Sequence, residues 1–347
     1  MDQSDYRILQ LISDENYHSG QKLAEIFGTS RAAISKRVSK INQFLEEQLT
    51  NYHINTIVGK GYCLNQQFDY LCLETIRKQL LTPAELIFFP VLNSTNDYLI
   101  NKHLLDNQFT VCFTEMQTAG RGRSTQAGKK IWYSPFGNNI YCSMGWNYYG
   151  NQNLLLGLSL VAGLSVAEVL TDHGATNVGL KWPNDVLLDN KKIAGILMEI
   201  IGEPNGSCKL VLGFGINIGD NYNNKLLTSL EQNINQPWVN LKNNLKTNLK
   251  NNLNITRNII IINLLNKFIS YYNFFIKDGL KDFLQKWQKY DVLHDRLVNI
   301  KLANENKLGK ALGLDNQGAL LVEINSKQQV FYSGEVSVCL GLDTTNL

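Results

Sequence analysis

The segment from Ser19 to Asn65 constrains the fold most strongly, because it predicts two helices, a tight break and a hairpin in close succession. "SGQKLAEIFGTSRAAISKRVSKINQFLEE" predicts a short helix, a Gly-Thr-Ser break and a longer helix for which Ser30 is a favourable N-cap. Apolar residues at helical spacing form one stripe on the longer helix: Ile34, Val38, Ile41 and Leu45. "INTIVGKGYCLN" then predicts two short strands about a Gly-Lys-Gly turn. This order of elements predicts a winged helix-turn-helix.

The basic residues of the longer helix lie opposite the apolar stripe, with no acid between Ser30 and Phe44. Acids and bases balance over residues 1–65, and the whole chain has a formal net charge of only +3, so the segregation of charge is the informative feature. A solvated helix face is the plainer alternative. The pattern favours a helix that enters the DNA major groove. The predicted DNA-contacting residues are Ser30, Arg31, Ala32, Ser35, Lys36, Arg37, Lys40 and, at the hairpin tip, Lys60.

A chain of 347 residues, 44% of them hydrophobic, is expected to form two or three compact units. Its longest apolar window, Ile259–Ile276, is interrupted by Asn263, Asn266, Lys267 and Asn273, which favours a buried amphipathic helix over a membrane span. The polar start of the chain predicts that no signal peptide is present. A cytoplasmic protein without membrane association is therefore expected.

The cysteines and histidines are scattered along the chain. The six cysteines form no C-x-x-C pair, and the five histidines form no H-E-x-x-H motif. This distribution argues against a zinc site or a disulfide framework and favours reduced thiols. No residue is predicted to be a metal ligand.

The central part of the chain predicts strands mixed with a few helices, without strict alternation, and therefore an α+β unit with a mixed sheet. The expected strands are Ile87–Leu92, Phe109–Glu115, Asn139–Met144, Val178–Trp182, Lys192–Ile200 and Lys209–Ile218. The expected helices are a linker helix at Asp69–Leu81, one that begins at Thr95, and a long apolar one at Asn153–His173. Short alternating strands from Leu297 onward predict a small β-barrel. The expected division is 1–66, 67–83 (the linker), 84–292 and 293–347.

The stretch "QTAGRGRSTQAGKKIWYSPFGNN" suits a loop that grips an anion. Gly120 and Gly122 allow the backbone to approach a ligand closely, while Arg121 and Arg123 supply fork-shaped donors for carboxylate or phosphate. The stretch matches neither a Walker A loop nor a dinucleotide fingerprint. A plain basic surface turn is the alternative on these residues alone.

Three further motifs place polar or small residues where strands end. "GLKWPNDVLLDNKKIAGILMEI" puts Lys181 at the end of a predicted strand, which suits a catalytic cation, although a surface lysine beside a turn is the plainer alternative. In the same motif, Asp189 and Asn190 predict a hairpin turn. "VLGFGINIG" puts Gly213 and Gly215 on a strand that another group can approach closely, and "NSTND" is a helix capping box in its simplest interpretation.

These features, without a Ser-His-Asp triad or a metal cluster, favour electrostatic chemistry on two anions, such as the activation of a carboxylate by a nucleotide.

The ordered motifs "AGRGR…WYSPFGNNIYCSM", "KWPND", "KIAGILME" and "GFGINI" resemble those of biotin–protein ligases. "SGQKLAEIFGTSRAAISK…GKGYCL" is similar to the DNA-binding domain of the bifunctional members, which combine a biotin operon repressor with a biotin–acetyl-CoA-carboxylase ligase. "DNQGALLVE…SGEVSV" resembles their C-terminal domain. The resemblance covers nearly the whole chain and is weakest over 220–290.

The resemblance implies a ligase domain like that of class II aminoacyl-tRNA synthetases and an SH3-like C-terminal barrel. It also implies a reaction in which ATP, with Mg²⁺, converts biotin to biotinyl-5′-AMP. The biotinyl group then passes to a lysine on the biotin carboxyl carrier protein of acetyl-CoA carboxylase. The adenylate-bound homodimer is expected to bind operator DNA as a repressor. Two alternatives remain at this point: a lipoate or octanoate ligase, and a ligand-sensing repressor with little or no ligase activity.

The resemblance also implies roles for individual residues. Residues implied at the ureido end of biotin are Ser94, Thr95, Asn96 and Gln117. The loop implied to close over biotin and the adenylate contains Gly120, Arg121, Gly122 and Arg123, and both arginines are expected to assist catalysis. Lys181 is expected between the biotin carboxylate and the α-phosphate, as the main electrostatic catalyst. Further adenylate contacts are implied for Asn184, Asn217 and Trp238, the last as an adenine-stacking ring.

Two features depart from the family pattern. Eight residues, "STQAGKKI", separate Arg123 from the aromatic-Ser-Pro run, where repressor-type members have a shorter segment. The segment 220–255 is rich in Asn, which makes the adenylate-ordered loop hard to align. Loop closure and the coupling to repression are therefore the properties in which this chain is expected to differ from the family.

Overall fold

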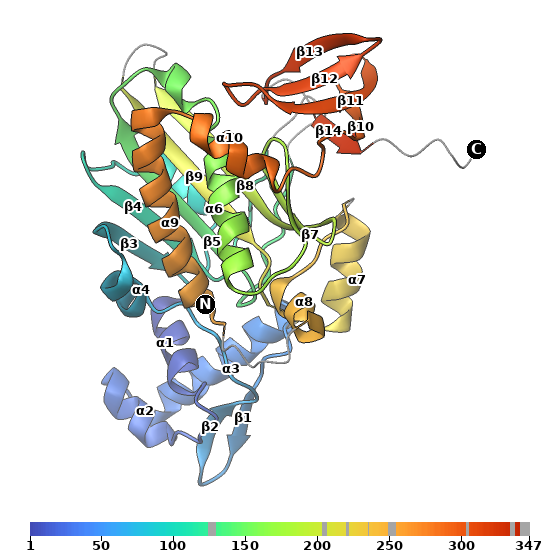
Figure 1. The fold of residues 1–347 in the computed structure, drawn as a ribbon. Coiled ribbons are helices and arrows are strands. Elements are labelled where there is room, and N and C mark those ends of the chain that lie inside the picture. Colours follow the sequence, from blue (N-terminus) through green and yellow to red (C-terminus); the bar gives the residue numbers. More distant parts are fainter. Residues whose placement is uncertain are drawn as a thin grey trace.

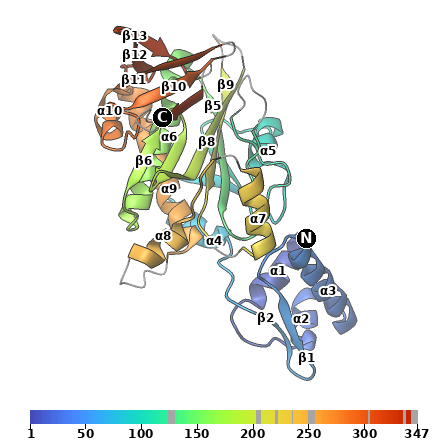
Figure 2. The ribbon, with the colours of Figure 1, turned by 90° about the vertical axis from the view of Figure 1, so that its right-hand side faces the viewer.

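The computed structural model describes residues 1–123, 130–202, 207–219, 222–234, 236–248, 255–302, 305–333 and 337–340. Three units follow one another along the long axis of the molecule (Figure 1). A small helical unit lies at one end, a seven-stranded sheet with its helices lies in the centre, and a five-stranded sheet lies at the other end. The view turned by 90° shows the same order (Figure 2).

The N-terminal unit is the predicted winged helix-turn-helix. Its elements are α1 (Gln3–Leu11), α2 (Gly20–Phe27), α3 (Arg31–Glu47), β1 (Ile54–Ile57) and β2 (Gly61–Leu64). The Ser30 side chain caps α3 by accepting a hydrogen bond from the Ala33 amide, and the predicted apolar stripe is buried. Gly59 and Gly61 adopt positive φ angles at the turn between the two strands, and Lys60 is exposed between them.

The linker helix is shorter than the sequence predicts. Helix α4 spans Leu73–Gln79, whereas the prediction was Asp69–Leu81. Phe68 and Leu71 are buried in the junction between the first two units, which keeps the chain before α4 extended. Tertiary burial has overridden the local helix pattern here.

The central sheet is mixed, as predicted. Its strand order is β3-β4-β5-β9-β8-β7-β6; β3 and β4 are parallel, and every other neighbouring pair is antiparallel. The strands are β3 (Ala84–Phe89), β4 (Phe109–Thr114), β5 (Ile140–Tyr148), β6 (Val178–Lys181), β7 (Asp185–Leu188), β8 (Lys191–Gly202) and β9 (Cys208–Ile216). The predicted hairpin turn at Asp189 and Asn190 is confirmed, since both residues have positive φ angles. It connects β8 to β7, a short strand that the sequence prediction had not separated.

Helices cover the sheet on both faces. Helices α6 (Leu158–Asp172), α9 (Arg257–Asp278) and α10 (Lys281–Gln288) pack on one face, and α5 (Thr95–Asn101) contacts β4, β5 and β9. Helix α6 begins later than predicted, after Gly157 in a left-handed conformation and a short 3-10 turn at Gln152–Leu155. The remaining described helices are α7 (Asn224–Asn233) and α8 (Leu241–Asn248).

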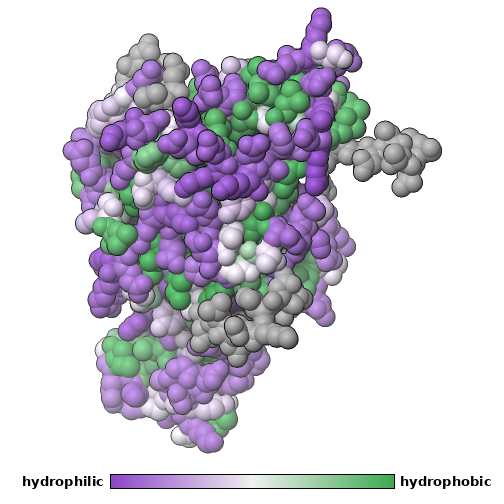
Figure 3. Space-filling model, in the orientation of Figure 1, coloured by the Kyte–Doolittle hydropathy of each residue, from purple (hydrophilic) through white to green (hydrophobic). Residues whose placement is uncertain are grey.

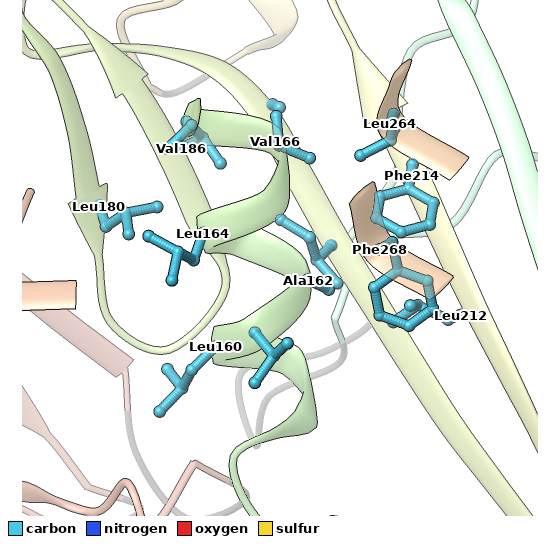
Figure 4. Packing of buried hydrophobic residues seen from close by; sticks show 14 of the residues in the cluster. Leu160, Ala162, Leu164, Val166, Leu180, Val186, Leu212, Phe214, Leu264 and Phe268 are labelled. Atoms are coloured by element: carbon cyan, nitrogen blue, oxygen red, sulfur yellow. The ribbon is translucent and has the colours of Figure 1, made fainter. Parts of the chain in front are cut away.

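Helix α9 is the one described helix that is long and apolar enough to cross a membrane by length and composition. In the structure it is a core helix, because Leu264 and Phe268 are buried among α6 and β9 residues such as Phe214 (Figure 4). The face of the molecule shown in Figure 3 is mostly hydrophilic, with hydrophobic residues in small groups. The predicted buried amphipathic helix is confirmed.

The C-terminal unit is a small antiparallel β-structure, as predicted. Its strand order is β13-β12-β11-β10-β14. The strands are β10 (Leu297–Lys301), β11 (Asn306–Leu314), β12 (Leu320–Ile324), β13 (Lys327–Phe331) and β14 (Ser337–Leu340). The exact boundaries proposed between the units, at residues 66, 83 and 292, remain predictions.

Candidate active site

Two adjoining cavities open beside the central sheet. The larger has a volume of about 700 Å³ and the smaller about 50 Å³. Five residues line both cavities: Gly122, Arg123, Trp132, Asn184 and Lys192. The predicted site motifs therefore meet in one place, although they are spread along much of the chain.

The four residues predicted at the ureido end of biotin all line the smaller cavity. Gln117 Oε1 accepts hydrogen bonds from the amide and the hydroxyl of Thr95, at 3.0 and 3.2 Å. Ser143 Oγ lies 2.6 Å from Thr95 Oγ1 and 2.5 Å from Asn96 Oδ1. Ser94 caps α5 through the Asp97 amide, so its side chain has the structural role of the capping box. The result is a polar wall whose groups are already oriented.

Gly213 and Gly215 make room for two of the lining side chains. A Cβ atom at Gly213 would lie 2.3 Å from Asn96 Oδ1, and one at Gly215 would lie 2.4 Å from the Trp132 ring. Both glycines were predicted to allow close approach, and in the structure the approaching groups are side chains of the pocket. Any larger residue on this part of β9 would displace them.

The two arginines of the loop have different environments. Arg121 donates to both carboxylate oxygens of Glu199, at 2.8 and 2.7 Å, and lies 2.6 Å from Asp97. Its charge is therefore matched by two acids of the protein, a pairing that the sequence analysis did not predict, and its contact with an anionic ligand remains a prediction. Arg123 lines both cavities and donates to the Ser333 carbonyl of the C-terminal unit. Burial lowers the pKa of the Arg123 guanidinium.

The ends of the loop that carries these arginines are pinned together. The Gly122 amide donates to the Lys130 carbonyl at 2.8 Å, and the Trp132 amide donates to the Gly120 carbonyl at 2.9 Å. The predicted insertion Ser124–Ile131 lies largely outside the described residues, which resume at Lys130. The two described ends of the loop are therefore held together by hydrogen bonds.

The larger cavity is rich in cations. The basic residues that line it are Arg123, Lys130, Lys181, Lys192 and Lys301, whereas Asp185 is the one acid among its described lining residues. Burial, followed by the charge of Lys192, lowers the pKa of Lys130. Burial would raise the pKa of Asp185, but Lys192 and Lys181 hold it below its usual range. Such an excess of positive charge suits a polyanion such as a nucleoside triphosphate.

Lys192 is the functional candidate that the sequence prediction missed. It lines both cavities, whereas Lys181 lines the larger cavity alone. Its Nζ lies 2.6 Å from Asp185 Oδ1 and 5.5 Å from the centroid of a Trp132 ring. The available signal was a lysine directly before the apolar run "IAGIL", because a lysine on a mostly buried strand is usually paired or functional.

Trp238 and Asn217 line the larger cavity beside Lys192, as the prediction of adenylate contacts requires. The Lys192 amide donates to the Pro237 carbonyl at 2.8 Å, and the Val239 amide donates to the Lys192 carbonyl at 3.0 Å. These bonds fix the Trp238 backbone against β8. Tyr222 adds a second ring, 5.8 Å from Trp238 and nearly perpendicular to it.

The predicted DNA-binding surface is polar, but two of its cations are paired within the unit. Arg37 and Lys40 lie 2.6 and 2.8 Å from Asp5, a buried residue of α1, and both also approach Asp2. Two of the four predicted DNA-contacting bases on α3 are therefore paired with acids in this structure, and their contact with DNA remains a prediction. Their acids lie on another helix, where a search of α3 alone could not find them. The predicted residues that are exposed on α3 are Arg31, Ala32, Ser35, Lys36 and Lys40.

Comparison with known proteins agrees with this arrangement. Residues 88–217 match the model of the biotin/lipoate A/B protein ligase family, residues 294–338 match the biotin protein ligase C-terminal domain, and residues 6–63 match a helix-turn-helix domain. The bifunctional ligase/repressor BirA of Salmonella typhimurium is 34% identical over 332 residues, which cover 95% of this chain and 96% of that protein. The protein of the same name from Escherichia coli is 33% identical over 333 residues, with 96% of each chain covered.

The chain belongs to the bifunctional ligase/repressor family. A solved structure of the Aquifex aeolicus biotin protein ligase, in complex with biotin and ATP, is also similar to this family member. It is 25% identical, has a TM-score of 0.59, and covers 74% of this chain and 99% of its own. The family assignment rests on the full-length relatives, which match all three units.

Proposed function

We propose that the smaller cavity binds biotin and the larger cavity binds ATP, so that the chain forms biotinyl-5′-AMP where the cavities meet. A carboxylate oxygen of biotin attacks the α-phosphorus of ATP, and pyrophosphate leaves with the electrons of the broken bond. The observation that carries the proposal is Lys192, the one described lysine that lines both cavities. A cation at this position can neutralise both anions and stabilise the charge that develops on phosphorus.

The other site residues support this assignment. The side chains of Thr95, Asn96 and Gln117 are oriented by hydrogen bonds within the protein. Their donors and acceptors suit the ureido ring of biotin, which presents both kinds of group. The ion pairs of Arg121 with Glu199 and Asp97 fix the position of the loop. Arg123 faces the nucleotide. Lys181 contacts the phosphates from the larger cavity.

Mg²⁺ is proposed to bind with the phosphates of ATP. Asn184 and Asp185 provide oxygen atoms at the larger cavity, and Mg²⁺ in nucleotide sites is commonly held by one or two carboxylates together with phosphate oxygens. The described residues contain no cluster of three or more His, Cys, Asp or Glu side chains that could hold the ion alone. The nucleotide would therefore supply most of the ligands.

In the second step the amine of an acceptor lysine attacks the biotinyl carbonyl, an amide forms, and AMP leaves. The acceptor is proposed to be the biotin carboxyl carrier protein of acetyl-CoA carboxylase, in the cytoplasm. An unpaired edge of the central sheet offers a docking place. Within the described residues, β7 pairs with β8 only up to Gly195, and the exposed Ile200 and Ile201 follow. Either the carrier or a second copy of the chain could extend the sheet there.

The winged helix is proposed to bind operator DNA when the adenylate-bound chain forms a homodimer. Ligand-ordered loops would lower the entropic cost of association, and two winged helices would then contact two half-sites. DNA binding should require ligand and should weaken steeply as the salt concentration rises. Binding that is independent of both would contradict the repressor proposal.

The direct test of ligase activity uses the full chain with ATP, Mg²⁺, biotin and an apo carrier domain, followed by avidin blotting. The proposal predicts a labelled carrier that is absent when any one component is omitted. A protein that binds biotinyl-AMP without labelling the carrier would be a sensor only. Labelling with lipoate in place of biotin would point to the related lipoate ligases.

A further inference from the structure

Three distant segments of the chain converge on one buried carboxylate, that of Glu115. Arg257 Nη1 lies 2.6 Å from Glu115 Oε2, and the two side chains are 1% and 0% exposed. The hydroxyl of Tyr6, on the first helix of the winged-helix unit, donates to Glu115 Oε1 at 2.5 Å. The Leu71 amide of the linker donates to the same oxygen at 3.1 Å. This cluster around Glu115, called the Glu115 node below, therefore joins the winged helix, the linker and the ligase unit.

The environment of this node makes each partner depend on the others. Burial would lower the pKa of Arg257, but Glu115 and Asp69 raise it above its usual value, so the guanidinium stays charged. Burial and the neighbouring Glu115 raise the pKa of Tyr6, so its hydroxyl remains a proton donor. Removing one member of such a buried, hydrogen-bonded set leaves the remaining charge poorly compensated.

The node is also continuous with the candidate active site. Glu115 lies two residues before Gln117 of the smaller cavity, and its carbonyl accepts from the Gly137 amide at 3.1 Å. Arg257 Nη1 donates at 3.0 Å to the carbonyl of Asn139, a residue that lines the larger cavity. The backbone segments on either side of the arginine loop are thus attached to the same buried ion pair.

A second contact links the winged helix to the nucleotide side. Asn51, in the loop after α3, donates through Nδ2 to the Tyr222 carbonyl at 3.0 Å. Tyr222 lines the larger cavity, and its ring lies against that of Trp238. The winged helix therefore also contacts a residue on the nucleotide side of the site.

We infer that Tyr6 acts as a latch that fixes the winged helix on the ligase unit through the Glu115–Arg257 pair and couples its position to the order of the active site. The inference rests on the proposed function for the identity of the ligands. Ligand that orders the loops beside Gln117 and Asn139 stabilises the latched orientation. Loss of the latch loosens those loops in return, because the coupling between two sites is reciprocal.

The test compares Tyr6→Phe with Tyr62→Phe in the full chain by hydrogen–deuterium exchange. Tyr62 is also buried in the winged helix, and no hydrogen bond of its hydroxyl is found in the described structure. Tyr6→Phe should accelerate exchange in residues 66–72 and 136–141 by roughly tenfold or more, the effect of losing one hydrogen bond to a charged group. Tyr62→Phe should leave both segments within twofold of the wild type.

Adding biotin and ATP should slow exchange at residues 66–72 in the wild type and should do so much less in Tyr6→Phe. Acceleration confined to α1, or an equal response in both variants, would overturn the latch. If biotin and ATP fail to bind, the ligand effect disappears in the wild type while the difference between the two ligand-free variants remains, which separates the two proposals. Glu115→Gln, with its fold checked by circular dichroism, should also accelerate exchange at residues 66–72. Exchange at the wild-type rate in that folded variant would overturn the inference.

Discussion

The two cavities of the site share five lining residues but are built in opposite ways. The smaller is formed mainly by β8, β9 and the start of α5, and its polar groups are already hydrogen-bonded to one another. The larger is lined by loop residues together with residues of β6, β7, β8, α7 and the C-terminal unit, and it carries an excess of positive charge. A rigid, satisfied wall recognises a ligand by shape and hydrogen-bond pattern, whereas a cation-rich cavity recognises a polyanion by charge.

The difference explains the placement of catalysis between them. The polar wall of the smaller cavity suits a neutral ring, and the cations of the larger cavity suit a polyanion, so the two reactants can meet only where the cavities adjoin. Lys192 lies where the two cavities adjoin, and its Nζ is 2.6 Å from Asp185 Oδ1 of the larger cavity. The variants below should separate the contributions of the two cavities.

The largest effect is expected for Lys192→Ala, because this change removes the cation common to both cavities. The rate of biotinyl-AMP formation should fall by roughly two to three orders of magnitude, the scale of losing one preorganised electrostatic group. Single-turnover measurement of adenylate formation is the appropriate assay. Lys191→Ala, at the exposed neighbouring position, is the matched control and should be near wild type.

Lys181→Ala sharpens the same comparison. Lys181 was predicted from the sequence to be the main catalyst, but it lines the larger cavity alone. Its loss should therefore raise the KM for ATP more than the KM for biotin, and it should slow adenylation by roughly tenfold, the effect of one hydrogen bond to a charged group. A larger loss than that of Lys192→Ala would restore Lys181 to the central role.

Gly215→Ala tests the shape of the smaller cavity. The new Cβ would meet the Trp132 ring at 2.4 Å, so the ring must shift. The KM for biotin should rise by roughly ten- to thirtyfold, which corresponds to the usual cost of overpacking, and the KM for ATP should rise less, because the ring is only one of many groups that line the larger cavity. Gly163→Ala is the control, because its Cβ would have ordinary contacts of 3.6 Å or more. Equal effects on both KM values would show that the cavities are not separate.

Trp238→Ala tests the adenine end of the larger cavity. Loss of a stacking ring should raise the KM for ATP by roughly five- to tenfold and leave the KM for biotin unchanged. Trp238→Phe should recover most of the affinity, since it retains an aromatic face. An unchanged KM for ATP would remove Trp238 from the nucleotide site.

The smallest effect concerns the winged helix, where the distinction is again between free and paired charge. Among the described residues no carboxylate pairs with Lys36, whereas Lys40 is paired with Asp5. If each contacts one phosphate, Lys36→Ala should lower the salt dependence of DNA binding by a slope of about 0.9. Lys40→Ala should change it less. Binding titrations across a salt series would show a reversed order if the ion pairs open on DNA.

Local sequence signals predicted the elements whose ends are set by their own residues. Ser30 and Ser94 cap the helices that they were expected to cap, and Asp189 and Asn190 form the expected hairpin turn. The mixed sheet followed from the order of strands and helices. The start of α4 was not predictable in this way, because the burial of Phe68 depends on the neighbouring unit.

The site residues show the same limit. The motifs identified the loop, the glycines and the polar wall, because each has an unusual local composition. The pairing of Arg121 with Glu199, and the position of Lys192 between the cavities, depend on strands that are distant in the sequence. Tertiary contacts decide which acids pair with each cation and which cations lie at the site, and residue spacing alone does not contain that information.

The account is tested most directly by exchange of radiolabelled pyrophosphate into ATP, measured with the full chain in the presence of Mg²⁺. Exchange reports the reversible adenylation step without the carrier protein. The account predicts exchange that depends on biotin, that lipoate and octanoate do not support, and that Lys192→Ala reduces at least a hundredfold. Exchange that proceeds without biotin, or equally well with lipoate, would contradict the assignment of the two cavities.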